Sequence, residues 1–211
     1  MRLSAAATDR RQVGGRTDAD PDSTVRRESS PPFPVVTFRL TARSRRPSPS
    51  LVIAAPRPRE VWPVVTVHEG LSPASRRLRY SAPTPRLSPR MLRTLTNLRP
   101  GHHEAYAGWS EGRPVGNVRW IRTPGLPDTA ELALEVVDAE QGRGVGRALG
   151  AFAASRALRE GIRTMVVSVD PENDRVHLWL ASLGARATID DADWFTVPAE
   201  ALCRRPLAAL G

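Results

Sequence analysis

The sequence of 211 residues contains no lysine, so all 31 of its basic residues are arginine. A P-loop needs a lysine on the phosphates and Schiff-base chemistry needs a lysine amine, so both are excluded. A single cysteine, Cys203, rules out an internal disulfide and a cysteine-rich zinc site. The four histidines have no ligand-like spacing, so no metal is expected. No apolar run reaches the roughly eighteen residues of a membrane-spanning helix, which favours a cytoplasmic protein with no membrane partner.

Positive charge is concentrated in the N-terminal half of the chain, although the formal net charge is +9. Residues 1–60 carry 12 arginines against six acidic residues, residues 61–99 carry seven against one, and residues 100–211 carry 12 against 15. This composition predicts a disordered Arg/Pro/Ser-rich leader over residues 1–59. The alternative is a basic arm that binds nucleic acid by counterion release. Stretches such as residues 43–49 lack interleaved aromatic residues, so nucleic acid is not the expected partner.

Ordered structure is predicted from about residue 60. Residues 61–67 (VWPVVTV) fit a short edge strand, because their proline has no N–H for a central ladder. Ser72 and Ser88, each followed by proline, mark the starts of two helices. After them come strands at 104–109, 115–123 and 129–137, a helix at 144–160, a strand at 162–169, a helix capped by Asp170 with Pro171 first, and a strand at 194–197. This order predicts one mixed α/β domain over residues 60–205, with a tail at 206–211.

A glycine-rich turn, residues 142–146 (GRGVG), lies between a predicted strand and a predicted helix. The third glycine of a dinucleotide fingerprint would fall on Arg147, so the turn is not a Rossmann loop. Unpaired N–H groups and the helix dipole favour an anion at such a position, and Arg143 and Arg147 add positive charge. On the residues alone, a phosphate-binding loop and a plain tight turn remain equally open.

Read as Gln141-x-x-Gly144-x-Gly146, the turn resembles the acyl-CoA pyrophosphate signature Q/R-x-x-G-x-G/A of the GNAT superfamily of N-acetyltransferases. Its placement, after a strand and at the start of a helix, is similar to that family as well. The wider segment 130–149 (AELALEVVDAEQGRGVGRAL) resembles a sub-group with the pattern AE-x-A-x-x-V-x-D-x-x-Q-G-R-G-x-G.

Two further segments extend the resemblance to about residues 62–197. Residues 71–80 and 87–92 are similar to the N-terminal part of the GNAT domain of bacterial protein-lysine acetyltransferases. Downstream, Asn173 followed by Gly184 resembles the family segment N-x-x-A-x-x-L-Y-x-x-x-G-F.

The resemblance implies a GNAT fold, which is a mixed, mostly antiparallel sheet flanked by helices. It also implies acetyl-CoA as co-substrate, no metal, and direct acyl transfer to an amine such as a protein lysine or a small-molecule amine. In this family the end of a strand faces the thioester and pantetheine, the turn faces the diphosphate, and an asparagine lies near the pantetheine arm. The matching cofactor-binding residues are Val136, Val137, Gln141, Gly142, Arg143, Gly144, Val145, Gly146, Arg147 and Asn173.

A general base is expected from the strand at 129–137, where Glu131 and Glu135 alternate onto one face. Glu131 matches the acidic position of the family's A-E pattern and is our first candidate, with Glu135 second. For either residue, a solvated strand carboxylate without a catalytic role remains the alternative.

One position departs from the family pattern. The family's general-acid tyrosine would fall on Leu180, which belongs to the apolar stripe of its helix and cannot donate a proton. Water or another group would then have to protonate the thiolate. The alternative function is an acyl-CoA-binding regulatory module with weak or lost catalysis. The sequence leaves the acceptor and the oligomeric state open.

Overall fold

The computed structural model describes residues 36–39, 50–57, 59–188 and 193–204, all within the unit formed by residues 31–211. The tail at 206–211 and most of the expected leader lie outside the described residues.

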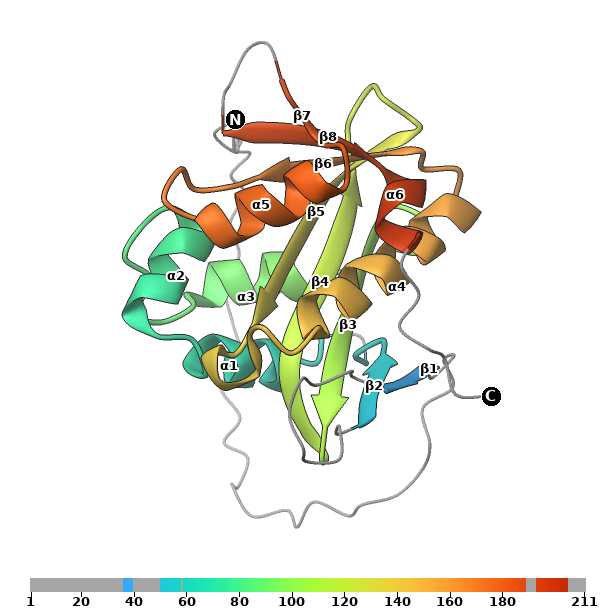
Figure 1. The fold of residues 1–211 in the computed structure, drawn as a ribbon. Coiled ribbons are helices and arrows are strands. Elements are labelled where there is room, and N and C mark those ends of the chain that lie inside the picture. Colours follow the sequence, from blue (N-terminus) through green and yellow to red (C-terminus); the bar gives the residue numbers. More distant parts are fainter. Residues whose placement is uncertain (1–35, 40–49, 58, 189–192, 205–211) are drawn as a thin grey trace, which may run out of the picture. The chain divides into compact units, whose positions relative to one another are not determined.

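The described strands form one eight-stranded sheet in the order β1-β2-β3-β4-β5-β6-β8-β7 (Figure 1). The strands are β1 (Val36–Arg39), β2 (Ser50–Ala54), β3 (His103–Ser110), β4 (Arg113–Arg122), β5 (Thr129–Val136), β6 (Thr164–Ser168), β7 (Arg186–Ala187) and β8 (Trp194–Pro198). Neighbouring strands are antiparallel except for β5 and β6, which are parallel. The predicted fold class, a mixed and mostly antiparallel sheet with helices, is therefore confirmed.

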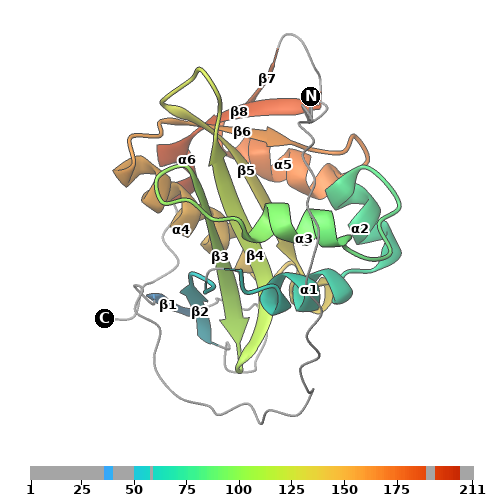
Figure 2. The same ribbon diagram turned by 180° about the vertical axis from the view of Figure 1, so that it is seen from behind.

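Helices cover both faces of the sheet. They are α1 (Trp62–Glu69), α2 (Pro73–Tyr80), α3 (Pro89–Thr96), α4 (Val145–Arg159), α5 (Asp174–Ser182) and α6 (Ala199–Cys203), with the short 3-10 helix η1 (Asp138–Glu140). Helix α4 crosses one face of β3 and β4, and α1 and α3 lie on the opposite face (Figures 1 and 2). The core under α4 includes Trp120, Leu149 and Met165, all fully buried. No helix in the described part of the chain is both long and apolar enough to cross a membrane.

Local sequence signals place several elements correctly. The hydroxyls of Ser72 and Ser88 accept hydrogen bonds from the backbone N–H groups of Ser75 and Met91, each at 3.2 Å. Both serines are therefore N-caps, as predicted, and a proline follows each in the first turn.

Two element predictions are wrong. Residues 61–67 belong mostly to helix α1, because a proline fits the first turn of a helix and Val64 and Val67 turn toward the interior at helical spacing. Helix α5 begins at Asp174 and not near Asp170, and its cap is Asn173, whose side-chain oxygen accepts from Val176 N at 3.4 Å.

The packed domain also begins earlier than residue 60. Strand β2, inside the stretch assigned to the leader, pairs with β3 from Leu51 to Ala54, and the side chains of Leu51 and Ile53 are fully buried. A five-residue strand followed by two prolines gives too short a pattern to stand out from an Arg/Pro-rich segment.

Candidate functional site

The parallel strands β5 and β6 are paired over only three residues, ending at Glu131↔Val166. Strand β5 continues to Val136 without a partner on that side. Backbone groups alternate along a strand, and Val137 N donates to Val115 O of β4 at 3.0 Å. The even-numbered residues Leu132, Leu134 and Val136 therefore direct their N–H and C=O groups to the open edge. An open edge of this kind can bind the amides of an extended ligand.

This alternation corrects one expected contact. The N–H of Val137 is bonded within the sheet, so it cannot face a thioester or a pantetheine amide. Val136 has the required direction, and its carbonyl accepts from Gln141 Nε2 at 3.1 Å. Of the two predicted backbone donors, only Val136 remains a candidate.

The glycine-rich turn connects the end of β5 to helix α4. Gly142 and Gly144 have φ angles of 76° and 92°, which favour glycine, and α4 begins at Val145. The first backbone bond of the helix runs from Ala148 N to Gly144 O at 3.0 Å. The N–H groups of Val145, Gly146 and Arg147 thus have no partner within the helix, and no side chain caps this end. These donors and the helix dipole would favour an anion such as a phosphate at the turn.

Hydrogen bonds hold the residues that precede the glycine-rich turn, Asp138 and Gln141, in place. Gln141 Nε2 donates to Asp138 Oδ1 at 3.0 Å as well as to Val136 O. Asp138 Oδ2 accepts from Ser72 N at 3.3 Å. Desolvation would raise the pKa of Asp138, but hydrogen bonds from Ser72 and Ser75 lower it, so the carboxylate stays charged. The turn is therefore tied to the start of α2.

The arginines near the turn differ in availability. Arg143 forms an ion pair with Glu140 Oε1 at 2.9 Å, whereas Arg147 is exposed. Arg175, which sequence reasoning missed, lies in the first turn of α5, and its Nη1 donates to Gln141 Oε1 at 3.2 Å. Its Nη2 lies 3.2 Å from where a Cβ of Gly142 would be. The guanidinium of Arg175 thus lies beside the turn, in addition to the arginines of the turn itself. The only sequence signal for Arg175 was its position two residues after Asn173.

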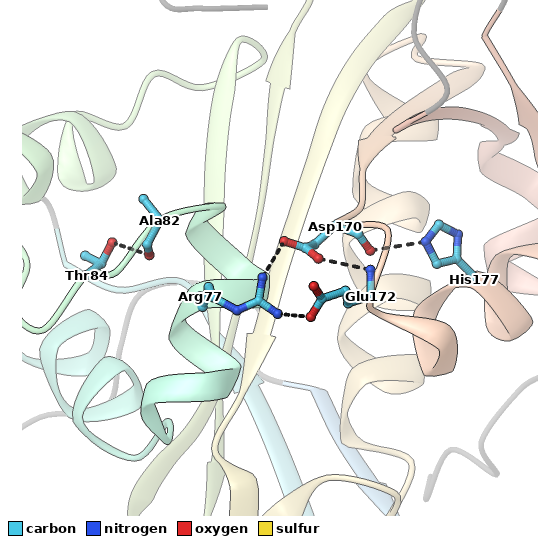
Figure 3. A network of polar contacts seen from close by, with 6 residues as sticks. All are labelled: Arg77, Ala82, Thr84, Asp170, Glu172 and His177. Atoms are coloured by element: carbon cyan, nitrogen blue, oxygen red, sulfur yellow. Dashed lines mark hydrogen bonds and ion pairs between the residues drawn. The ribbon is translucent and has the colours of Figure 1, made fainter.

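The segment between β6 and α5 is joined to α2 by ion pairs (Figure 3). Arg77 Nη1 lies 3.6 Å from Asp170 Oδ2, and Arg77 also contacts Glu172. His177 Nε2 lies 3.2 Å from Asp170 O. These contacts link helix α2 to the β6 side of the gap that opens between β5 and β6.

Leu180 is 1% exposed, so it is a core residue as its position in the apolar stripe predicts. Asn173 caps α5, and a contact with pantetheine stays a prediction.

Glu131 and Glu135 lie on one face of β5 but in different surroundings. Glu131 is exposed, belongs to the last residue pair of β5 and β6, and has no hydrogen bond or ion pair with any described residue. Glu135 is 4% exposed and accepts hydrogen bonds from Tyr80 Oη at 3.0 Å and Asn117 Nδ2 at 3.3 Å. A general base must reach its substrate, and of the two carboxylates only that of Glu131 is exposed.

An open strand edge leading to an anion site at a helix start defines a class of protein that binds an elongated ligand with a phosphate-like end. Residues 71–185 match the model of the Acetyltransferase (GNAT) family. The chain belongs to that family, which implies acyl-CoA-dependent N-acyl transfer.

Solved structures agree with the fold. The GNAT domain of S. lividans PAT is 25% identical with a TM-score of 0.67, over 81% of this chain and 98% of that one. Mycobacterium smegmatis RimJ in complex with CoA-disulfide is 18% identical with a TM-score of 0.56, over 79% and 88% of the two chains. An acetyltransferase of the GNAT family from Staphylococcus aureus is 12% identical with a TM-score of 0.57, over 71% and 99%. No curated protein matched the sequence.

Proposed function

We propose that the protein is an acetyl-CoA-dependent N-acetyltransferase that transfers the acyl group directly to an amine. The observation that carries this proposal is one continuous path along β5. It runs from the anion site at the glycine turn, along the open edge at Leu132, Leu134 and Val136, to the exposed Glu131 at the point where β5 and β6 meet. Acetyl-CoA has the matching parts in the same order, namely a diphosphate, two amides and a reactive thioester.

The residues along the path have separate roles in this proposal. The N–H groups of residues 145–147 bind the diphosphate, and Arg175 and Arg147 add charge-assisted contacts. The backbone of Leu134 and Val136 pairs with the pantetheine amides. Bound acetyl-CoA supplies the activated acyl group. Glu131 accepts the proton that makes the acceptor amine neutral and nucleophilic.

Leu180 supports the second candidate, an acyl-CoA-binding regulatory module. The buried aliphatic side chain leaves no proton donor at the position of the family's tyrosine, so in an active enzyme water or another group must protonate the CoA thiolate. Weak turnover would follow if that route were slow.

The test is release of CoA thiol from acetyl-CoA across a panel of amines. We expect acceptor-dependent release by the wild-type chain and a loss of about 10²- to 10⁴-fold in Glu131→Gln. Glu111→Gln is the matched control, because Glu111 is exposed in the β3–β4 turn. Binding of acetyl-CoA without release for any amine would favour the regulatory module.

A further inference from the structure

A cluster of polar side chains is buried between β3–β5 and helices α1–α3. We call it the buried polar cluster. His103, Asn117, Arg119 and Glu135 are each 4–7% exposed. The partly buried Arg79 and Tyr80 of α2 complete the cluster. Core positions of this kind are normally filled by apolar residues or by fully paired polar groups.

Within the buried polar cluster, Arg119 forms an ion pair with Glu135 but donates no hydrogen bond to a described residue. Its side chain is 6% exposed, yet none of its five N–H groups donates a hydrogen bond to a residue in the described part of the chain. The nearest carboxylate atom, Glu135 Oε1, lies 3.7 Å from Nη2, which is beyond hydrogen-bond distance. A buried guanidinium without hydrogen bonds is costly unless another group satisfies it.

Glu135 is the ion-pair partner of Arg119 but accepts no hydrogen bond from it, whereas its two oxygens accept from Tyr80 and Asn117. The same carboxylate is also 3.8 Å from Nε of Arg79, which lacks a hydrogen bond as well. Two guanidinium groups therefore share one buried carboxylate, and the exposed Glu131 is a further carboxylate whose charge acts on Arg119. An anionic ligand would occupy the N–H groups of Arg119 that donate no hydrogen bond.

Arg119 also lies beside a small pocket and close to the proposed base. Arg119 and Asn117 both line this pocket, which lies under α1 and α3. In the β4–β5 register Arg119 faces Ala133, whereas Glu131 faces Ile121, so the two side chains are diagonal neighbours on one face. Such neighbours lie about 7–8 Å apart at the backbone, within reach of long side chains.

We propose that Arg119 binds a carboxylate of the acceptor, so that the acceptor is an amine that also carries a carboxylate, such as an amino acid. In this arrangement the amine lies at Glu131 and the carboxylate accepts hydrogen bonds from Arg119, with Arg79 adding charge. The inference rests on the proposed N-acyl transfer and specifies its substrate class. Arg119 is a specificity-determining residue here and takes no part in the proton transfer.

The experiment compares paired acceptors with the full chain: L-lysine with 1,5-diaminopentane, and L-phenylalanine with 2-phenylethylamine. We expect kcat/KM to be about 10- to 100-fold higher for the amino acid of at least one pair, mainly through KM, because a charge-assisted contact contributes on this scale. Arg119→Gln should remove the preference, and Arg119→Lys should restore part of it. Arg113→Gln, on an exposed residue of the same strand, should leave it intact.

Equal use of both members of each pair by the wild-type chain would overturn the inference without any variant. An equal loss for both members in Arg119→Gln would also overturn it, since that is the result of a purely structural role. If no amine is acylated, the proposed transfer fails. The carboxylate site is then tested by the thermal stabilisation that each member of the same pairs gives in the presence of CoA. Greater stabilisation by the amino acid, lost in Arg119→Gln, supports a carboxylate site, and equal stabilisation contradicts it.

Discussion

Leu51→Ala in the intact chain is predicted to destabilise the whole domain. Leu51 is fully buried in β2, and its Cδ1 lies 3.2 Å from where a Cβ of Gly108 would be. The side chain therefore fills the space that this glycine leaves open, and rigid strands around it cannot collapse into a cavity. Removal of a buried leucine of this kind costs about 2–5 kcal/mol. This is a large part of the 5–15 kcal/mol that is typical of a domain.

Urea unfolding followed by tryptophan fluorescence and by circular dichroism measures this cost. In thermal unfolding, the Tm should fall by roughly 4–20 °C, at about 2–4 °C per kcal/mol for a chain of this size. Val52→Ala is the matched control, because Val52 is next in the strand but only half-buried, and it should cost less. A change of less than about 0.5 kcal/mol in Leu51→Ala, or equal effects of the two substitutions, would refute the inclusion of β2 in the packed domain.

Two further predictions concern the interior and the anion site. Burial and, after it, the positive charge of Arg119 lower the pKa of His103 below its ordinary value of 6.5. At this residue the unfolded chain therefore binds more protons than the folded chain as the pH falls. The free energy of unfolding should therefore decrease from pH 7.5 toward pH 5.5, and it should decrease less steeply in His103→Gln. Denaturant unfolding at several pH values measures this, and parallel pH profiles for the two proteins would contradict it. Arg175→Gln should weaken acetyl-CoA binding in calorimetry by about 10-fold or more, since a charge-assisted contact is lost. The exposed Arg186→Gln should leave that affinity unchanged, and equal affinities for Arg175→Gln and wild type would contradict the role of Arg175.

Local chemistry made part of this structure predictable from sequence. Ser72 and Ser88 each satisfy a free N–H at a helix start, and this signal lies within three residues of sequence. The glycine turn was predictable because left-handed φ angles at Gly142 and Gly144 restrict the residue type. Leu180 was placed correctly because helical spacing alone puts it on the core stripe.

The rest depended on relations between distant segments. Whether Val136 or Val137 faces the open edge follows from the register of β4 on β5, which no local pattern specifies. Glu131 and Glu135 look alike in sequence, and only the packing of α2 against β5 separates the exposed carboxylate from the buried one. Arg175 reaches the glycine turn because α5 packs beside α4, a contact that a sequence pattern does not reveal.

The central claim, an acyl-CoA site built from the glycine turn and the open edge of β5, is tested most directly by the Tm of the full chain with and without acetyl-CoA. At a concentration 100 times Kd, binding adds about 2.7 kcal/mol of stability, which corresponds to a rise of roughly 5–11 °C. Gly144→Glu should abolish this rise, because a carboxylate would enter the anion site. Gly112→Glu places the same residue at another positive φ, 75°, in the β3–β4 turn and should keep the rise. No rise for the wild-type chain at millimolar acetyl-CoA, or an undiminished rise in Gly144→Glu, would contradict the claim.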